Sequence, residues 1–308
     1  MPGLELTPYI WFDGRLIPSE EAKIHVLTHA LHYGTSYFEG IRAYACSDGT
    51  SAVFRLKEHM KRFVNSGKIL RLTCPYDLAT MEKAVIDTMV ANKMSAGYIR
   101  PLAWVGEGPL GVFPGNPVHV IVATWPWGAY LGAEALEMGV RVKTSSFNRI
   151  HPNTLMGKAK AGGNYVNSVQ AKMEAEQSGY DEALMLDVNG CVSEATGENV
   201  FIVRNNVLKT TPGVSILEGI NRDAIMCLAE DLGYRVVEQV FTRDEMYTAD
   251  EAFFCGTAAE VTPIRELDDR IIGEGHAGPV TKAIQKAFFE AAHGENEKYA
   301  HWLTHYRF

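Results

Sequence analysis

EATGENVFIVRNNVLKTTPGVSILEGINR, residues 194 to 222, is the stretch that decides the fold. Its residues 199–204 are mostly apolar, as in a buried strand, and the Asn205-Asn206 pair that follows favours a turn. After Gly219, apolar residues recur at helical spacing, which predicts a helix over about 222–232 with Asn221 as its N-cap. The order strand, turn, helix is typical of α/β proteins.

The remainder of the chain continues this alternation. In the second half we predict strands at 138–143, 182–187, 235–240 and 251–255, and helices at 164–178 and 279–292. In the first third we predict hairpin turns at Asp13-Gly14 and Asp48-Gly49, helices at 57–70 and 77–93, and strands at about 97–105 and 118–124. The sequence therefore predicts an α/β chain.

The aromatic stretch from Trp125 to Gly132 separates the two halves, because Pro126 and two glycines interrupt any regular element there. We predict a small N-terminal domain at 1–125, an interdomain loop at 126–136 and a large C-terminal domain at 137–308. A solvated linker would be polar, so we expect the aromatic residues to pack over a ligand cleft between the domains.

Composition excludes several classes of protein. The chain has 308 residues, and its 29 Lys+Arg against 37 Asp+Glu give a net charge of −8 without any block of five like charges. This argues against a nucleic-acid footprint or a polybasic membrane surface and favours a small ligand. The start lacks a signal-peptide pattern and no apolar run is long enough to span a bilayer, so we expect a soluble, cytoplasmic protein.

The five cysteines are scattered and odd in number, without a Cys-x-x-Cys pair. We therefore predict neither a disulfide framework nor a zinc site, but reduced thiols that pack as small apolar residues.

Two patterns suggest chemistry but fail on context. Gly106-x-Gly108-x-x-Gly111 fits the dinucleotide fingerprint of a nicotinamide-binding oxidoreductase, yet the Pro- and Gly-rich residues after it cannot start the helix that the fingerprint needs. His25, His29 and His32 are spaced as on one helical face, but no His-Glu-x-x-His motif accompanies them. We interpret the glycines as a mobile loop and the histidines as packing or surface residues, and predict no metal.

Two lysines, Lys158 and Lys160, stand among small residues just before the predicted helix at 164–178, whose N-cap could be Asn164. A lysine on such a segment can point into a cleft, lose its proton near neutral pH and act as an amine nucleophile. A surface lysine beside a glycine-rich turn is the alternative. The helix start at Asn221 also has two interpretations: it could bind a phosphate, or it could be a capped helix without a ligand.

About a dozen positions between Glu194 and Arg222 together resemble the signature of the class IV, pyridoxal-phosphate-dependent aminotransferases. They are Glu194, Thr196, 199–201, 208–210, Leu217, Gly219, Ile220 and Arg222. Stretches similar to the branched-chain amino acid aminotransferases of that family are 32–42, 54–55, 98–102, 160–165 and 256–260. Tyr98-x-Arg100 favours these over the D-amino acid aminotransferases and aminodeoxychorismate lyases, which stay as alternatives.

The resemblance implies a fold and a reaction. The fold would be that of fold type IV enzymes, with a small α/β domain and a larger, barrel-like domain with flanking helices. The reaction would be reversible transfer of the amino group of L-leucine, L-isoleucine or L-valine to 2-oxoglutarate.

The resemblance also implies pyridoxal 5'-phosphate as cofactor. Lys160 would hold it as a Schiff base and then, as a base, move a proton between substrate and cofactor carbons. Glu194 would face the pyridine nitrogen, and Tyr165 would hydrogen-bond the ring hydroxyl. The implied phosphate ligands are Arg55, the backbone of Ile220 and Asn221, and Thr257. The other residues of the implied cofactor site are Gly197, Leu217, Gly219 and Gly256.

For the substrate, the resemblance implies that Tyr98 and N–H groups of the turn at Thr257, Ala258 and Ala259 bind the α-carboxylate. Arg100 would bind the side-chain carboxylate of glutamate. The branched side chain would lie in an apolar pocket of Phe38, Tyr33, Trp127 and Tyr130. In the family the loop at 106–117 covers the neighbouring subunit's site, which implies a homo-oligomer built from dimers, with Val112 contributing across the interface.

Lys158 departs from the family pattern. In an extended segment its side chain would lie on the same face as that of Lys160, where it could depress the pKa of Lys160 or reach solvent. We expect it to reach solvent.

Overall fold

The computed structural model describes residues 5–113, 115–128 and 131–308. The chain forms two compact units. Unit 1 comprises 1–127, 159–163 and 290–308, and unit 2 comprises 128–158 and 164–289. Two segments from late in the chain therefore belong to the first unit, and one of them contains Lys160. Both units are mixed α/β, in agreement with the predicted fold class.

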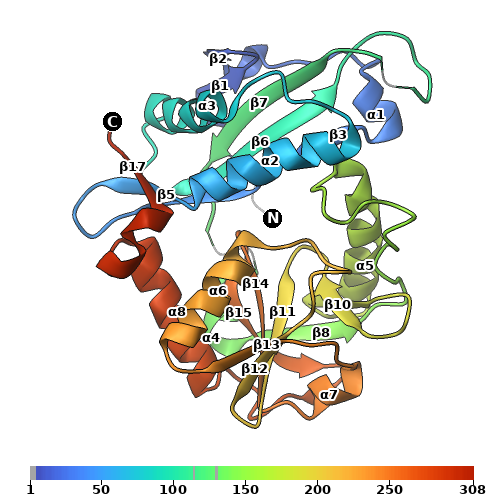
Figure 1. Cartoon of the computed structure of the whole chain (residues 1–308), viewed down its shortest axis with the longest axis vertical. Coiled ribbons are helices and arrows are strands. Elements are labelled where there is room, and N and C mark those ends of the chain that lie inside the picture. Colours follow the sequence, from blue (N-terminus) through green and yellow to red (C-terminus); the bar gives the residue numbers. More distant parts are fainter. Residues whose placement is uncertain (1–4, 114, 129–130) are drawn as a thin grey trace. The chain divides into compact units, whose positions relative to one another are not determined.

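An eight-stranded sheet runs through unit 1, with the strand order β17-β5-β4-β6-β7-β1-β2 and with β3 paired to β6 (Figure 1). Every one of these pairings is antiparallel. The strands are β1 (Tyr9–Phe12), β2 (Arg15–Pro18), β3 (Ser36–Phe38), β4 (Ile41–Ala45), β5 (Ser51–Phe54), β6 (Gly97–Val105), β7 (Val118–Trp125) and β17 (Leu303–Tyr306).

Two helices, α2 (Leu56–Leu70) and α3 (Leu78–Ala91), pack together on this sheet (Figure 1). Leu56, Met60 and Phe63 recur at spacings of four and three, so they form one apolar stripe on α2, which is fully buried in the core. The Asp77 carboxylate accepts from the Thr80 amide at 2.8 Å and caps the start of α3. The shorter helices of unit 1 are η1 (Ser19–Glu21), α1 (His29–Tyr33) and η3 (Glu297–Trp302).

A close approach of β3 to α2 depends on Gly67. A Cβ atom at that position would lie 2.7 Å from the Tyr37 hydroxyl oxygen and 2.6 Å from the Leu72 carbonyl oxygen. The absent side chain lets the fully buried Tyr37 pack against the helix, and this places the end of β3 beside α2.

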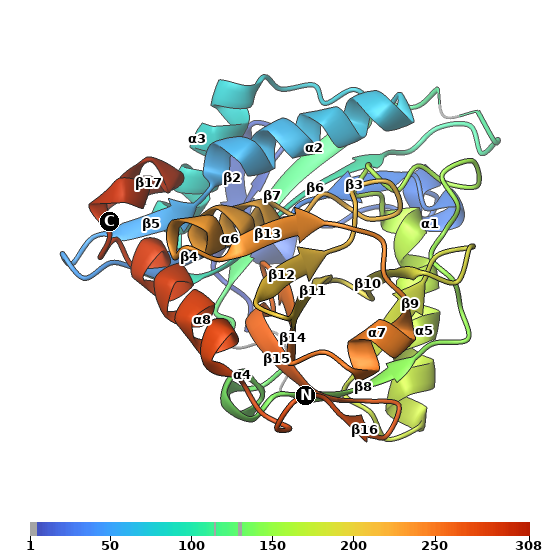
Figure 2. The ribbon, with the colours of Figure 1, turned by 60° about the horizontal axis from the view of Figure 1, so that its bottom comes forward.

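Unit 2 contains a nine-stranded sheet in the order β10-β9-β8-β15-β14-β11-β12-β13, with β16 paired to β15. Its pairings are antiparallel except for β8 with β9, β8 with β15, and β12 with β13. The sheet curls so far that β10 also lies against β11, which gives it a barrel-like form (Figure 2). The strands are β8 (Val140–Thr144), β9 (Glu182–Leu186), β10 (Val192–Ala195), β11 (Asn199–Arg204), β12 (Val207–Thr210), β13 (Arg235–Glu238), β14 (Glu251–Gly256), β15 (Glu260–Leu267) and β16 (Arg270–Ile271).

Helices flank this sheet: α5 lies along β8 and β9, α6 along β13 and β14, and α4 along β15. They are α4 (Ala133–Met138), α5 (Tyr165–Gln177), α6 (Ile220–Asp231), α7 (Arg243–Tyr247) and α8 (Pro279–Ala292), with the 3₁₀ turn η2 (Gly162–Asn164) before α5. No helix in the described part of the chain is long and apolar enough to cross a membrane.

Of the two predicted N-caps, that of α6 is wrong and that of α5 is right in position. Helix α6 starts at Ile220 with Gly219 as N-cap, so Asn221 lies inside the first turn, and its side-chain amide donates to the Gly256 carbonyl at 3.0 Å. Asn164 is the N-cap of α5, as predicted, but it has helical dihedral angles and makes no side-chain cap bond. Its amide instead donates to the Met156 carbonyl at 3.3 Å. Glycine serves as the N-cap of α6 because a β-carbon there would collide with the Asn199 amide oxygen.

Candidate active site

Lys160 is held by its backbone in unit 1. Its N–H donates to the Ser66 hydroxyl of α2 at 3.0 Å, and its carbonyl accepts from the Phe38 N–H at the end of β3 at 3.0 Å. Ala161 adds a β-bridge to Tyr37. The following residue, Gly162, passes so close to Ser36 that a Cβ atom would clash with the serine hydroxyl. These contacts fix the direction in which the lysine side chain leaves the backbone.

Phe38 brings the lysine together with a guanidinium group. The Lys160 ammonium nitrogen lies 5.1 Å from the Phe38 ring centroid, and the Arg100 guanidinium carbon lies 4.5 Å from the same centroid. Arg100 also lies over the rings of Tyr98, at 5.5 Å, and Trp125, at 5.8 Å. The Nε of Arg100 is buried and has no hydrogen-bond partner among the described residues. A planar cation in this setting is suited to a carboxylate ligand.

Tyr98 passes next to Gly40, where a β-carbon would collide with its hydroxyl, and the edge of its ring packs against Trp127 at 4.5 Å between centroids. Unit 1 thus brings together the predicted site residues Lys160, Phe38, Tyr98, Arg100 and Trp127.

Tyr33 and Val112 lie on exposed parts of the same unit. Tyr33 ends α1 and packs on the buried His29 ring, whose Nε2 lies 2.7 Å from the Gly111 carbonyl oxygen. Val112 follows in the loop and is 89% exposed. Tyr130 lies outside the described residues. Those described from 106 to 117 form bends and irregular backbone and no helix, as predicted. The structural basis for a dinucleotide fingerprint is therefore absent from these residues.

Sequence analysis did not predict a buried cluster of charged residues, which Glu39 forms with His59 and Arg62 of α2. Arg62 donates to the two oxygens of the Glu39 carboxylate at 2.6 and 2.8 Å, and the His59 Nδ1 lies 2.8 Å from the same group. Burial alone would raise the pKa of Glu39, but the Arg62 charge and these hydrogen bonds lower it to about 2. Burial lowers the pKa of His59, and the Arg62 and Lys160 charges lower it further, against the opposing effect of Glu39.

Arg62 and Ser66 are four residues apart on α2, hence on one face of it. Arg62 is thus placed on the helix face that holds the Lys160 backbone.

Arg55, the predicted phosphate ligand, donates to Glu58 at 2.8 Å and lies over the Trp302 ring at 5.0 Å. Its phosphate role stays a prediction, and Arg62 becomes a second candidate. A helical spacing of His59, Arg62 and Ser66 was the available signal.

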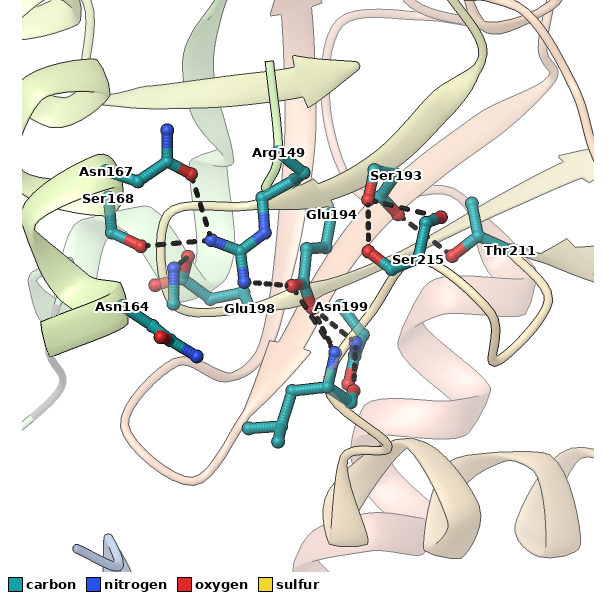
Figure 3. Close-up of polar contacts among 12 residues, drawn as sticks. Arg149, Asn164, Asn167, Ser168, Ser193, Glu194, Glu198, Asn199, Thr211 and Ser215 are labelled. Carbon is teal, nitrogen blue, oxygen red and sulfur yellow. Dashed lines mark hydrogen bonds and ion pairs between the residues drawn. The ribbon is translucent and has the colours of Figure 1, made fainter. Parts of the chain in front are cut away.

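In unit 2, Glu194 is buried on β10, and both of its carboxylate oxygens have polar contacts (Figure 3). One carboxylate oxygen lies 2.6 Å from an Arg149 nitrogen. The other accepts from the Asn199 amide and the Leu217 N–H, each at 3.2 Å. Such a carboxylate is held rigidly and can bind one further cationic N–H group.

The start of α6 and the turn between β14 and β15 lie together in unit 2, because Asn221 donates to Gly256. Thr257, Ala258 and Ala259 form that turn. Free N–H groups at a helix start attract anions, so this part of unit 2 is suited to a phosphate. Gly197 and Gly256 are neighbours here, since a Cβ atom on Gly256 would lie 3.4 Å from the Gly197 carbonyl oxygen. Tyr165 is the first residue of α5.

Lys158 is ion-paired: its ammonium lies 2.6 Å from a Glu218 carboxylate oxygen and donates to the Gly213 carbonyl. The side chain is 40% exposed and therefore reaches solvent, as expected, although these polar contacts also hold it in place. The described residues contain no group of three histidine, cysteine, aspartate or glutamate residues placed to hold a metal ion.

Sequence and structure comparisons place these features in a known context. The family model described as amino-transferase class IV matches residues 36–267. The branched-chain-amino-acid aminotransferase of Escherichia coli (strain K12) is 51% identical over 298 residues, covering 96% of each chain.

Two solved structures of the T.th. branched-chain amino acid aminotransferase are also similar. The one with pyridoxamine 5'-phosphate has a TM-score of 0.95 and 51% identity, and the one complexed with N-(5'-phosphopyridoxyl)-L-glutamate has a TM-score of 0.94 and 49% identity. Each alignment covers 98% of this chain and 99% of the other.

A second carboxylate beside Glu194 yields a prediction on stability. Burial raises the pKa of Glu198 to about 8, and the neighbouring Glu182 carboxylate adds to the shift. The pKa of Glu198 in the folded state lies above the ordinary value of 4.5. The protonated Glu198 therefore contributes fully to the free energy of unfolding below pH 4.5, and this contribution is lost as pH rises toward 8. Glu198→Gln cannot ionise. Urea titrations should show that wild type loses stability relative to the variant between about pH 5 and pH 8.5.

The exposed Glu230→Gln, on α6, is the matched control and should track wild type across this range. A difference between wild type and Glu198→Gln that does not grow with pH would contradict the assignment.

Proposed function

Because the chain belongs to the class IV aminotransferase family, we propose that Lys160, Glu194 and the other predicted cofactor-site residues bind pyridoxal 5'-phosphate. The chain is a pyridoxal-phosphate-dependent branched-chain-amino-acid aminotransferase. It transfers the amino group of L-leucine, L-isoleucine or L-valine reversibly to 2-oxoglutarate.

The observation that carries the site assignment is the pairing of Lys160 and Arg100 over one phenylalanine ring. The lysine supplies an amine for carbonyl chemistry. The aromatic rings around it accept an apolar side chain, and the arginine, with its unpartnered buried Nε, accepts a carboxylate. A transaminase that uses both leucine and glutamate requires these two properties in one pocket. Similarity to a structure complexed with phosphopyridoxyl-L-glutamate supports glutamate as the acidic partner.

The residues fit the cofactor by their chemistry. When bound, pyridoxal 5'-phosphate supplies an aldehyde that condenses with amines and a ring that accepts electrons from the substrate carbon. Lys160 Nζ would hold the aldehyde carbon of the cofactor and, once the substrate amine has taken its place, would carry the proton from the substrate α-carbon to that cofactor carbon. The Glu194 carboxylate would hold the proton on the ring nitrogen, and the Tyr165 hydroxyl would donate to the ring hydroxyl.

The phosphate is bound by the N–H groups at the start of α6, by Thr257 and by an arginine. Arg62 and Arg55 are the two candidates for that arginine. Arg62 is supported by its place on the helix face that holds the Lys160 backbone.

For the substrate, the Tyr98 hydroxyl and the N–H groups of the turn at Thr257, Ala258 and Ala259 bind the α-carboxylate. Phe38, Tyr33 and Trp127 surround the branched side chain; Tyr130, which lies outside the described residues, stays a predicted member of this pocket. This division of roles rests on the aromatic contacts of Tyr98 with Trp127 and of Phe38 with Lys160.

We further propose that the enzyme is a homo-oligomer built from dimers and works in the cytoplasm. Val166, Val169 and Met173 form a half-exposed apolar stripe on α5, and Val112 and Phe113 are 89% and 87% exposed in the loop. Such surfaces are typical of subunit interfaces. All five cysteines are free thiols, which fits a reducing compartment.

Lys160→Ala should lower transamination of L-leucine by at least about a thousandfold, because no other amine can replace it as the base. Lys158→Ala is the matched control and should stay near wild type. Steady-state rates with 2-oxoglutarate measure both variants, and comparable losses of activity in the two would contradict the role of Lys160 as the catalytic amine.

With wild type, faster turnover of D-alanine than of L-leucine would instead favour the D-amino acid aminotransferase alternative.

Arg100→Leu should raise the KM for glutamate and 2-oxoglutarate about tenfold or more and leave the KM for leucine nearly unchanged, because only the acidic substrates need a charge partner. Half-reactions with each amino acid separate the two effects. Equal losses for leucine and glutamate would show that Arg100 is not the side-chain carboxylate ligand.

Light scattering coupled to size-exclusion chromatography should give a particle mass of at least twice the 34.0 kDa of one chain. Charged substitutions in the α5 stripe, such as Val169→Asp, should reduce that mass. A wild-type monomer at micromolar concentration would contradict the dimer.

A further inference from the structure

Arg149 lies 2.6 Å from Glu194, the carboxylate proposed to face the cofactor ring. We propose that Arg149 is a positioning residue that keeps Glu194 ionised and oriented, and thereby keeps the ring nitrogen of the bound cofactor protonated. The proposal rests on the proposed function for the role of Glu194.

The geometry around Arg149 is that of a fixed anchor (Figure 3). Its backbone N–H donates to the Leu186 carbonyl at 2.8 Å, which ties it to the end of β9. One guanidinium nitrogen lies 2.6 Å from Glu194, and another is directed at the Asn167 amide oxygen at 3.3 Å, with Ser168 at 3.5 Å. The side chains of Arg149 and Glu194 are only 11% and 6% exposed.

The electrostatic argument begins with Glu194 alone. A buried carboxylate without a counter-charge binds a proton instead of staying ionised. The neutral donors at Asn199 and Leu217 hydrogen-bond it but carry no net charge. Arg149 places a positive charge 2.6 Å from the carboxylate, and this charge favours the ionised form of Glu194 before the cofactor binds.

With the cofactor bound, the order of charges is guanidinium, carboxylate, protonated ring nitrogen. Arg149 contacts the carboxylate directly, whereas it lies one group farther from the ring. It therefore stabilises the carboxylate more than it destabilises the ring cation, because Coulomb energy falls with distance. Its removal favours transfer of the ring proton to Glu194, which leaves a neutral and weaker electron-accepting ring.

The same side chain connects two parts of the cofactor site. Asn167 and Ser168 belong to the first turn of α5, which Tyr165 begins. Arg149 thus joins the carboxylate for the ring nitrogen to the helix that carries the partner of the ring hydroxyl. Because these contacts use separate nitrogens of one planar fork, a lysine, which keeps the charge but lacks the fork, should restore the function only in part.

The test uses the holoenzyme reconstituted with pyridoxal 5'-phosphate labelled with ¹⁵N in the ring, with NMR of that nitrogen as the readout. Wild type should show a protonated ring nitrogen near neutral pH. In Arg149→Met and Arg149→Gln the resonance should move toward the unprotonated position, and the dissociation constant of the cofactor should rise about tenfold or more. Arg149→Lys should lie between these variants and wild type.

Arg204→Met is the matched control, because it removes a cation of the same unit whose ion pair, with Glu245 at 3.8 Å, is a surface one. It should leave the ring resonance and the cofactor affinity unchanged. If Arg149→Met fails to fold, Arg149→Gln and Arg149→Lys still decide the matter. An unchanged ring resonance in the folded Arg149 variants would overturn the proposal. Failure of wild type to bind the cofactor would instead contradict the proposed function.

Discussion

The backbone hydrogen bonds of Lys160 are the constraint on which the candidate site depends. A helix hydroxyl, at Ser66, and a strand N–H, at Phe38, hold the two sides of the lysine peptide. The strand end lies close to the helix because Gly67 carries no side chain that would meet Tyr37. From this fixed start the lysine amine reaches over the Phe38 ring, beside Arg100.

Pairing of buried charges is the second theme of the structure. In unit 1, Glu39 is neutralised by Arg62, and in unit 2, Glu194 is neutralised by Arg149. Burying an ion is costly unless a partner of opposite charge accompanies it. Arg100 differs, because in the described part of the chain its guanidinium lies over aromatic rings and forms no ion pair. Arg100, a cation without a negatively charged partner among the described residues, is therefore the residue proposed to bind the substrate carboxylate.

The elements with strong local signals could be predicted from the sequence. The helices at 56–70, 165–177 and 279–292 and the strands at 97–105 and 199–204 carry apolar patterns of the right period. Strands β10 and β15 were missed, because β10 has only four residues and β15 contains Pro263 and several charged side chains. The predicted cap at Asn221 is wrong, because Gly219 takes the cap position and the Asn221 side chain bonds to Gly256.

Site residues followed a similar division. A family resemblance points to Lys160 and Glu194. The ion pairs of Arg62 with Glu39 and of Arg149 with Glu194 join residues that are 23 and 45 positions apart, so no local sequence pattern reveals these pairs.

Whether Lys160 carries the cofactor is tested most directly by borohydride reduction of the cofactor-loaded protein, followed by peptide mass spectrometry. The phosphopyridoxyl mass should be found on Lys160 and be absent from Lys160→Ala; its attachment to another lysine, or to none, would contradict the role given to Lys160.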